Sequence, residues 1–129
     1  MDKGTINVKI WVLSRDLDPD EISVMLNLKP TAAFRKGDRR GKGSLEFDRC
    51  HWHYESGPQE ELVAWEKAKA MIAIVQDHQE AFKKLRNAGA DLGFGISFRT
   101  GDYSLGMVLA NDDLRLLATC GFMIDIALY

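Results

Sequence analysis

The sequence has 129 residues, of which 46% are hydrophobic and 28% are charged, and its formal net charge at pH 7 is −2. This composition is typical of one globular domain with its own core, and we expect a single domain over residues 1–129. A sequence pI near 5.9 argues against a general nucleic-acid binder or a binder of anionic membranes. No apolar run approaches the ~20 residues of a membrane-spanning helix, and no signal-peptide core is visible. We therefore expect a cytoplasmic protein.

The first predicted elements are a strand and a short helix. Residues 5–13 alternate, with Ile6, Val8, Ile10 and Val12 on one side, which is typical of a strand with one core face. A helix should follow at Asp18, whose side chain can cap it. Pro19 suits the first helical position, and Glu21 completes a capping box.

The middle of the chain predicts a broken strand and a broken helix. The alternation in residues 45–54 changes phase near Asp48–Arg49, which indicates a bulge or a break. Residues 58–88 have helical spacing, but one helix of that length would span ~45 Å, so we expect a break near Gln76–His78. The residues with inward spacing are Leu62, Trp65, Ala68, Met71, Ile72, Val75, Phe82 and Leu85.

The last third predicts a hairpin, a helix and a strand. Residues 92–98 alternate, and the turn signal "TGDY" leads into a second alternating run at 103–110. A short helix over 111–121 and a strand over 122–128 follow. The predicted order is β-α-β-α-β-β-α-β. We expect an α+β fold: a two-layer sandwich with a mostly antiparallel sheet, helices on one face, and a ferredoxin-like arrangement.

One basic loop contrasts with the acidic remainder of the chain. The segment "FRKGDRRGKGS" at 34–44 carries a net charge of +4, with one acid, Asp38, among the cations Arg35, Lys36, Arg39, Arg40 and Lys42. It does not match a P-loop, because only three residues separate Gly37 from Gly41 and no hydroxyl residue follows Lys42. Two interpretations remain: a solvated connector, or a contact surface for an anion or an acidic partner.

The histidines and cysteines form no recognisable catalytic or metal motif. His51 and His53 share one face of a strand, but a zinc site requires three or four ligands, so we expect no metal and no cofactor. Cys50 and Cys120 are expected to be free buried thiols in a reducing compartment.

Two further features are candidate sites. "GFGISF" resembles the RNA-recognition sheet motif only partly, because Leu92 stands at its basic position, so we expect no RNA binding. Asp125 is a lone acid between two isoleucines in the last strand, and it could face a pocket with Trp52 or pair with Lys9 or Arg99. No activated nucleophile is visible, and we expect no enzyme.

Several of these motifs together resemble a known family. "DLDPDEISVMLNLKPT…FRKGD", the Trp52 strand and "LANDDLRLLATCGFMIDIALY" are similar to the bacterial family named domain of unknown function 4279. The matching positions are Pro19, Ile22, Leu26, Leu28, Pro30, Thr31, Lys36, Gly37, Asp38, Trp52, Leu114, Leu117, Gly121, Asp125 and Tyr129. The resemblance implies a bacterial cytoplasmic protein with no assigned activity, and small proteins of this kind often act as accessory or toxin-neutralising partners. It also implies that Gly37 and Asp38 serve the loop's architecture.

The sequence thus predicts a non-catalytic protein-interaction module whose basic loop meets an acidic protein partner. The alternative is a small-molecule or anion-binding protein that uses this loop and the sheet face near Asp125. The sequence does not predict an oligomeric state.

Overall fold

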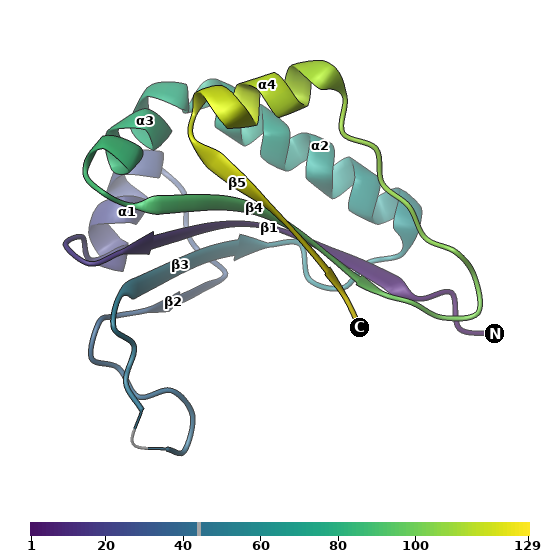
Figure 1. The fold of residues 1–129 in the computed structure, drawn as a ribbon, viewed down its shortest axis with the longest axis horizontal. Coiled ribbons are helices and arrows are strands. Elements are labelled where there is room, and N and C mark those ends of the chain that lie inside the picture. The colour runs from purple at the N-terminus through teal and green to yellow at the C-terminus, as the bar shows by residue number, and fades with distance from the viewer. Residues whose placement is uncertain (44) are drawn as a thin grey trace.

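The computed structural model describes residues 1–43 and 45–129 and shows a mixed α+β fold with a five-stranded sheet and four helices (Figure 1). The elements in chain order are β1 (Thr5–Ser14), α1 (Pro19–Leu26), β2 (Ala32–Phe34), β3 (Cys50–Glu55), α2 (Glu61–Asp77), α3 (Gln79–Asn87), β4 (Asp91–Arg99), α4 (Asn111–Thr119) and β5 (Phe122–Leu128). Within the described chain, none of the helices has the length and apolar character of a membrane span.

The sheet has the strand order β2-β3-β1-β4-β5. The pairs β2–β3, β3–β1 and β1–β4 are antiparallel, whereas β4 and β5 are parallel because α4 crosses between them. The helices cover one face of this sheet, and the other face stays open (Figure 1). The broad α+β prediction is confirmed, whereas the ferredoxin-like order is not.

The core lies between the sheet and the helices. β1 alternates as expected, with Ile6, Val8, Ile10 and Val12 fully buried. The same face of β3 and β4 contributes Trp52, Leu92 and Phe94, which are also fully buried. Burying a large apolar side chain stabilises a fold by roughly 1.5–3 kcal/mol, so this face provides most of the stability.

The predicted helix ends agree with the structure at two places. Asp18 caps α1: its Oδ1 accepts the Asp20 amide at 2.8 Å, and the Glu21 carboxylate accepts the Asp18 amide at 3.2 Å. The helical region breaks at His78, between α2 and α3, where the sequence predicted a break. The inward residues are mostly confirmed, but Leu62 is exposed and Ala64 takes its place in the core.

The second strand of the predicted hairpin, at 103–110, is not a strand. The alternation is real, since Leu105, Met107 and Leu109 are partly buried against the core. However, the segment leaves the sheet and packs on α2, where the Gly106 carbonyl accepts the Trp65 indole N–H and the Gly106 amide donates to Glu61. Alternation of apolar side chains indicates only that one face of a segment is buried. Here that face is buried against α2 and not within the sheet.

The phase change near Asp48–Arg49 marks the beginning of a strand. β3 starts at Cys50, and the residues before it belong to the return arm of a protruding hairpin. The short strand β2, which the sequence did not predict, pairs with β3 and lies at one edge of the sheet.

Candidate functional site

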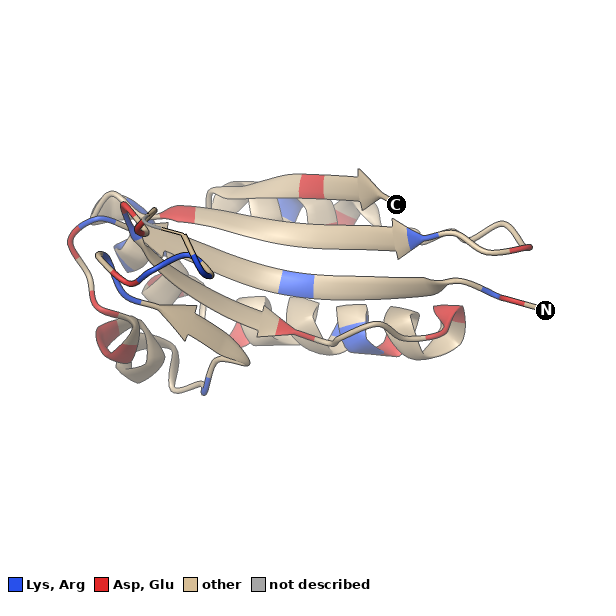
Figure 2. Ribbon diagram, turned by 90° about the horizontal axis from the view of Figure 1, so that it is seen from below, with Lys and Arg blue, Asp and Glu red and all other residues tan. Residues whose placement is uncertain are grey.

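The basic segment is an ordered hairpin that stands away from the open face of the sheet, at the β2–β3 end (Figures 1 and 2). We call the described residues 35–43 and 45–47 the basic hairpin. The Phe47 carbonyl accepts the Gly37 amide, the Phe47 amide donates to the Asp38 carbonyl, and the Arg40 amide donates to the Leu45 carbonyl, each at 2.8 Å. Arg39 and Glu46 form an isolated β-bridge. Backbone pairing therefore fixes the course of both arms.

Two of the predicted binding residues hold the hairpin in place. Arg35 bonds Asp18 at 3.0 Å and Asp20 at 2.8 Å, which ties the hairpin to the N-terminus of α1. The pKa of Asp18 is lowered, first by the Asp20 amide hydrogen bond and further by Arg35. Asp38 accepts the Arg35 amide at 2.7 Å, and Gly37 has a φ of 92°, a conformation that favours glycine. Gly37 and Asp38 thus have the architectural role that the resemblance implied.

The other predicted cations are exposed to solvent. Lys36, Arg39, Arg40 and Lys42 make no ion pair within the described residues. The hairpin carries five cations against the two carboxylates of Asp38 and Glu46, a net charge of +3. Figure 2 shows these charges gathered over one end of the open face. The structure thus separates one anchoring cation, Arg35, from four exposed cations without an ion pair among the described residues.

An aromatic ladder connects the hairpin to the sheet. The Phe47 ring stacks on Phe34 with centroids 4.6 Å apart, and its edge meets His51 at 4.8 Å. His51 stacks in turn on His53 at 5.8 Å. The Arg40 guanidinium lies 5.3 Å from the Phe47 centroid, in cation–π range. Arg40 is therefore held in a defined position on an ordered base.

The two histidines lie in a cationic and partly buried setting. Burial lowers the pKa of both imidazoles; nearby Arg49 and Arg40 lower that of His51 further, and Lys9 lowers that of His53 further. His53 Nδ1 lies 3.9 Å from Glu55, while its buried Nε2 has no hydrogen-bond partner among the described residues. Both imidazoles are thus favoured in the neutral form near pH 7.

Side chains of β1 cover the centre of the open face. Gly93 and Gly95 of β4 leave room for the side chains of β1, because a Cβ at Gly93 would lie 1.8 Å from the Trp11 ring and one at Gly95 would lie 3.0 Å from Lys9. The indole of Trp11 and the stem of Lys9 therefore cover these glycines. Asp125 stands next to Gly95 in the register, exposed on the edge strand.

The structure does not bring Trp52 and Asp125 together. Trp52 is fully buried on the helix side, where its indole N–H donates to Ser23 at 3.0 Å. Asp125 pairs with Gly95 in the register and shares its open face, so the sheet separates the two side chains. The two residues do not line a common pocket. Arg99, considered as a partner of Asp125, bonds Asp2 instead, at 2.9 Å.

The cysteines lie in the core, as expected. Cys50 and Cys120 are buried free thiols, and burial raises the pKa of Cys50 to about 11 and also raises that of Cys120. A thiol with a raised pKa is a poor nucleophile. Among the described residues, no three His, Cys, Asp or Glu side chains are grouped as metal ligands would be.

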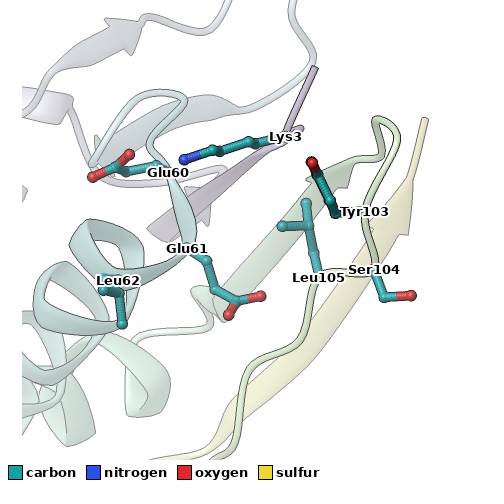
Figure 3. Close-up of a pocket in the computed structure, with 7 residues that line it drawn as sticks. All are labelled: Lys3, Glu60, Glu61, Leu62, Tyr103, Ser104 and Leu105. Atoms are coloured by element: carbon teal, nitrogen blue, oxygen red, sulfur yellow. The ribbon is translucent and has the colours of Figure 1, made fainter. Parts of the chain in front are cut away.

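A pocket with a volume of ≈ 390 Å³ lies between the start of α2 and the segment after the 100–103 turn (Figure 3). Its lining residues are Lys3, Glu60, Glu61, Leu62, Tyr103, Ser104 and Leu105. Glu61 already accepts the Gly106 amide at 2.9 Å, and Leu62 and Tyr103 are exposed. We therefore regard it as a surface depression at a chain crossing rather than a prepared ligand site.

The sequence predicted the charged residues of the site but not the stacked aromatic residues that support them. Phe34 and Phe47 flank the basic run, and their stacking depends on the pairing of β2 with β3. An aromatic residue at each end of a Gly-rich basic segment was the available signal. Trp11 as a cover for Gly93 was also missed, because it depends on which strand lies beside β1.

The fold and the site define a small α+β protein with one open sheet face and a basic hairpin at its edge. The family model described as "Domain of unknown function (DUF4279)" matches residues 4–129, and the chain belongs to this family. No curated protein and no solved structure matches it.

Proposed function

We propose that this protein is a non-catalytic protein-interaction module whose basic hairpin binds an acidic surface of a partner protein. The observation that carries the proposal is the ordered hairpin itself, which presents four exposed cations on a hydrogen-bonded and aromatic-packed base. A solvated connector has no need for this base. A rigid base lowers the entropy lost when arginine side chains bind, so it favours affinity.

Contacts within the hairpin favour a protein surface over a small anion. The amides of Arg35, Gly37, Asp38 and Arg40 already donate to groups of the hairpin. These four amides are therefore not available to cradle a phosphate. The exposed guanidinium groups of Arg39 and Arg40 remain suited to carboxylates at a protein interface.

The buried thiols and the neutral imidazoles support binding rather than catalysis. Cys50 and Cys120 lie in the core with raised pKa values, and His51 and His53 are packed in the aromatic ladder. Together with the family resemblance, the reduced buried thiols support a bacterial cytoplasmic setting. A toxin with an acidic active face is one partner class that this proposal covers.

The test compares two charge reversals of equal size. The variant Arg39→Glu/Arg40→Glu alters the hairpin, and Lys67→Glu/Lys69→Glu alters exposed positions of α2 on the helix side. Both lower the net charge by four, so a general charge effect cancels. Tagged wild type and both variants capture proteins from a bacterial lysate, and the captured proteins are quantified by mass spectrometry.

We expect a partner that the wild type and the α2 variant capture and that the hairpin variant loses. Its purified complex should weaken steeply between low and high salt, because exposed charge pairs are screened. A partner set that is identical for all three proteins would contradict the proposal. So would a complex whose affinity does not depend on salt.

A further inference from the structure

The edge strand β5 exposes an apolar surface that the proposed function does not use. Met123, Ile124, Ile126 and Leu128 are 50%, 40%, 64% and 74% exposed. Edge strands usually carry lysine, proline or a bulge that discourages pairing. β5 is a regular strand whose one charge is Asp125. This edge is therefore unprotected against pairing with another strand.

Backbone N–H and C=O groups of β5 point to the free edge of the sheet, where another strand could pair with them. The Tyr129 amide donates to the Phe98 carbonyl of β4 at 2.9 Å, so the backbone groups of Tyr129 point toward β4. Backbone direction alternates along a strand, so Ile124, Ile126 and Leu128 direct their N–H and C=O groups to the free edge. These residues also lie on the helix side of the sheet, in register with the buried side of β4. The free donors, free acceptors and apolar side chains thus occur on the same three residues.

We propose that a second copy of this chain pairs with β5 in antiparallel orientation, with Ile126 facing Ile126 on a two-fold axis. In this register Ile124 faces Leu128, and Asp125 faces Ala127. The two five-stranded sheets would join into one sheet with a continuous apolar strip on its helix side. Backbone groups that point outward pair with each other, as a hydrogen-bonded antiparallel pair requires.

The register follows from charge and pattern. A two-fold at Asp125 would place two carboxylates opposite each other, which is unfavourable in a cross-strand pair. A two-fold at Ile124 would leave Leu128 of each copy beyond the paired region. The two-fold at Ile126 places all three outward isoleucine and leucine side chains of each copy in the interface and separates the acids.

A second copy fits this edge better than the acidic partner of the hairpin does. The exposed surface here is apolar with one acid, so it offers no cation for an acidic partner. The helix α4, which contacts β5, also carries an exposed leucine, Leu114, at 41%. β5 and β2 lie at opposite edges of the sheet, so both basic hairpins stay free in the dimer. The proposed dimer does not depend on the proposed function, and the two can be tested separately.

The first test measures the mass of the full chain in solution by sedimentation velocity over a range of concentrations. We expect a concentration-dependent dimer for the wild type. Ile126→Lys places two ammonium groups at the two-fold and should weaken the dimer by on the order of 100-fold. The matched control Val24→Lys, at an 81% exposed position of α1, should leave the dimer intact. Circular dichroism checks that both variants fold.

The second test fixes the register by cysteine cross-linking with copper phenanthroline. In the proposed dimer the two Cα atoms at Ile126 lie about 5.5 Å apart, within disulfide range. The two Cα atoms at Asp125 lie about 8 Å apart, beyond the roughly 7 Å limit. The Ile126→Cys variant should therefore cross-link much faster than Asp125→Cys. The native Cys50 and Cys120 are buried and do not compete.

Three outcomes would overturn the inference. A wild type that is monomeric at every concentration would do so, whether or not β5 then binds a strand of another protein. A dimer that survives Ile126→Lys would place the interface elsewhere. Equal cross-linking of the Ile126→Cys and Asp125→Cys variants would reject the register.

Discussion

Trp11 and Trp52 lie on adjacent strands but on opposite faces of the same sheet. Trp52 pairs with Val12 and is fully buried under α1, where its indole N–H reaches Ser23. Trp11 pairs with His53 and lies half-buried on the open face, where it covers Gly93. The two residues illustrate how the two faces differ.

The covered face stabilises the fold, and the open face presents side chains to solvent. On the covered face, side chains from four strands pack against four helices. The open face carries Trp11, the histidine pair and the basic hairpin. The histidines and the hairpin form one aromatic and cationic surface that is partly exposed to solvent. Substitutions on the two faces should therefore separate folding from binding.

The largest effect is expected from Trp52→Ala. It opens a cavity in the core and leaves the Ser23 hydroxyl without its donor, so the free energy of unfolding should fall by about 3–5 kcal/mol. Trp11→Ala, the matched change on the open face, should cost less, roughly 1–2 kcal/mol, because its side chain is partly exposed and its removal leaves a gap open to solvent rather than a core cavity. Urea unfolding of both variants measures the difference. Equal losses would contradict the division between the faces.

Gly93→Ala should have the next largest effect. Its Cβ would collide with the Trp11 ring, so we expect a loss of roughly 1–3 kcal/mol. In a Trp11→Ala background the space is open, and the same change should be nearly neutral. A double-mutant cycle from four unfolding curves measures this coupling. Additive losses would show that Trp11 does not cover Gly93.

The histidine pair should make stability depend on pH in a defined direction. Folding lowers the pKa of His53 and His51, so below the ordinary value near 6.5 the unfolded chain binds protons that the folded chain does not. This contribution to stability is complete above pH 6.5 and is lost as the pH falls through the lower folded pKa values.

His53→Gln removes part of this dependence. The slope of unfolding free energy against pH, measured between pH 7 and pH 5, should therefore be flatter for His53→Gln than for the wild type. Lys9, which lowers the pKa of His53, and Glu55, which raises it, stay in place in both proteins. An identical slope would mean that His53 is not held in the neutral form.

The smallest effect on stability is expected from Arg39→Glu/Arg40→Glu. Arg39 is exposed and makes no ion pair among the described residues, and Arg40 contributes one cation–π contact, so the free energy of unfolding should change by no more than about 0.5–1 kcal/mol. The same variant should lose the captured partner. A large loss of stability here would make the hairpin part of the fold rather than a binding surface.

The sequence predicted those parts of the fold that are decided locally. The Asp18 capping box and the break at His78 depend on neighbouring residues, and both were found. The prediction of a strand at 103–110 was wrong, because alternation cannot distinguish burial against α2 from burial within a sheet. β2 has three residues, too few to show a period.

The candidate site was predictable in its charge and not in its geometry. The basic run was evident from composition, but only the structure shows that Arg35 is an anchor and that Arg40 packs over Phe47 without an ion pair among the described residues. The ladder from Phe34 to His53 depends on strand pairing between distant residues. Trp52 and Asp125 were placed near one another because their faces were assigned without knowledge of the register.

The central claim is that the basic hairpin is an ordered platform, and amide hydrogen exchange followed by NMR tests it most directly. The amides of Gly37, Arg40 and Phe47 donate to carbonyls across the hairpin, so they should exchange much more slowly than in an unstructured peptide. Phe47→Ala should remove this protection while the β1 amides keep theirs. Exchange of these three wild-type amides at the rate of a free peptide would contradict the account.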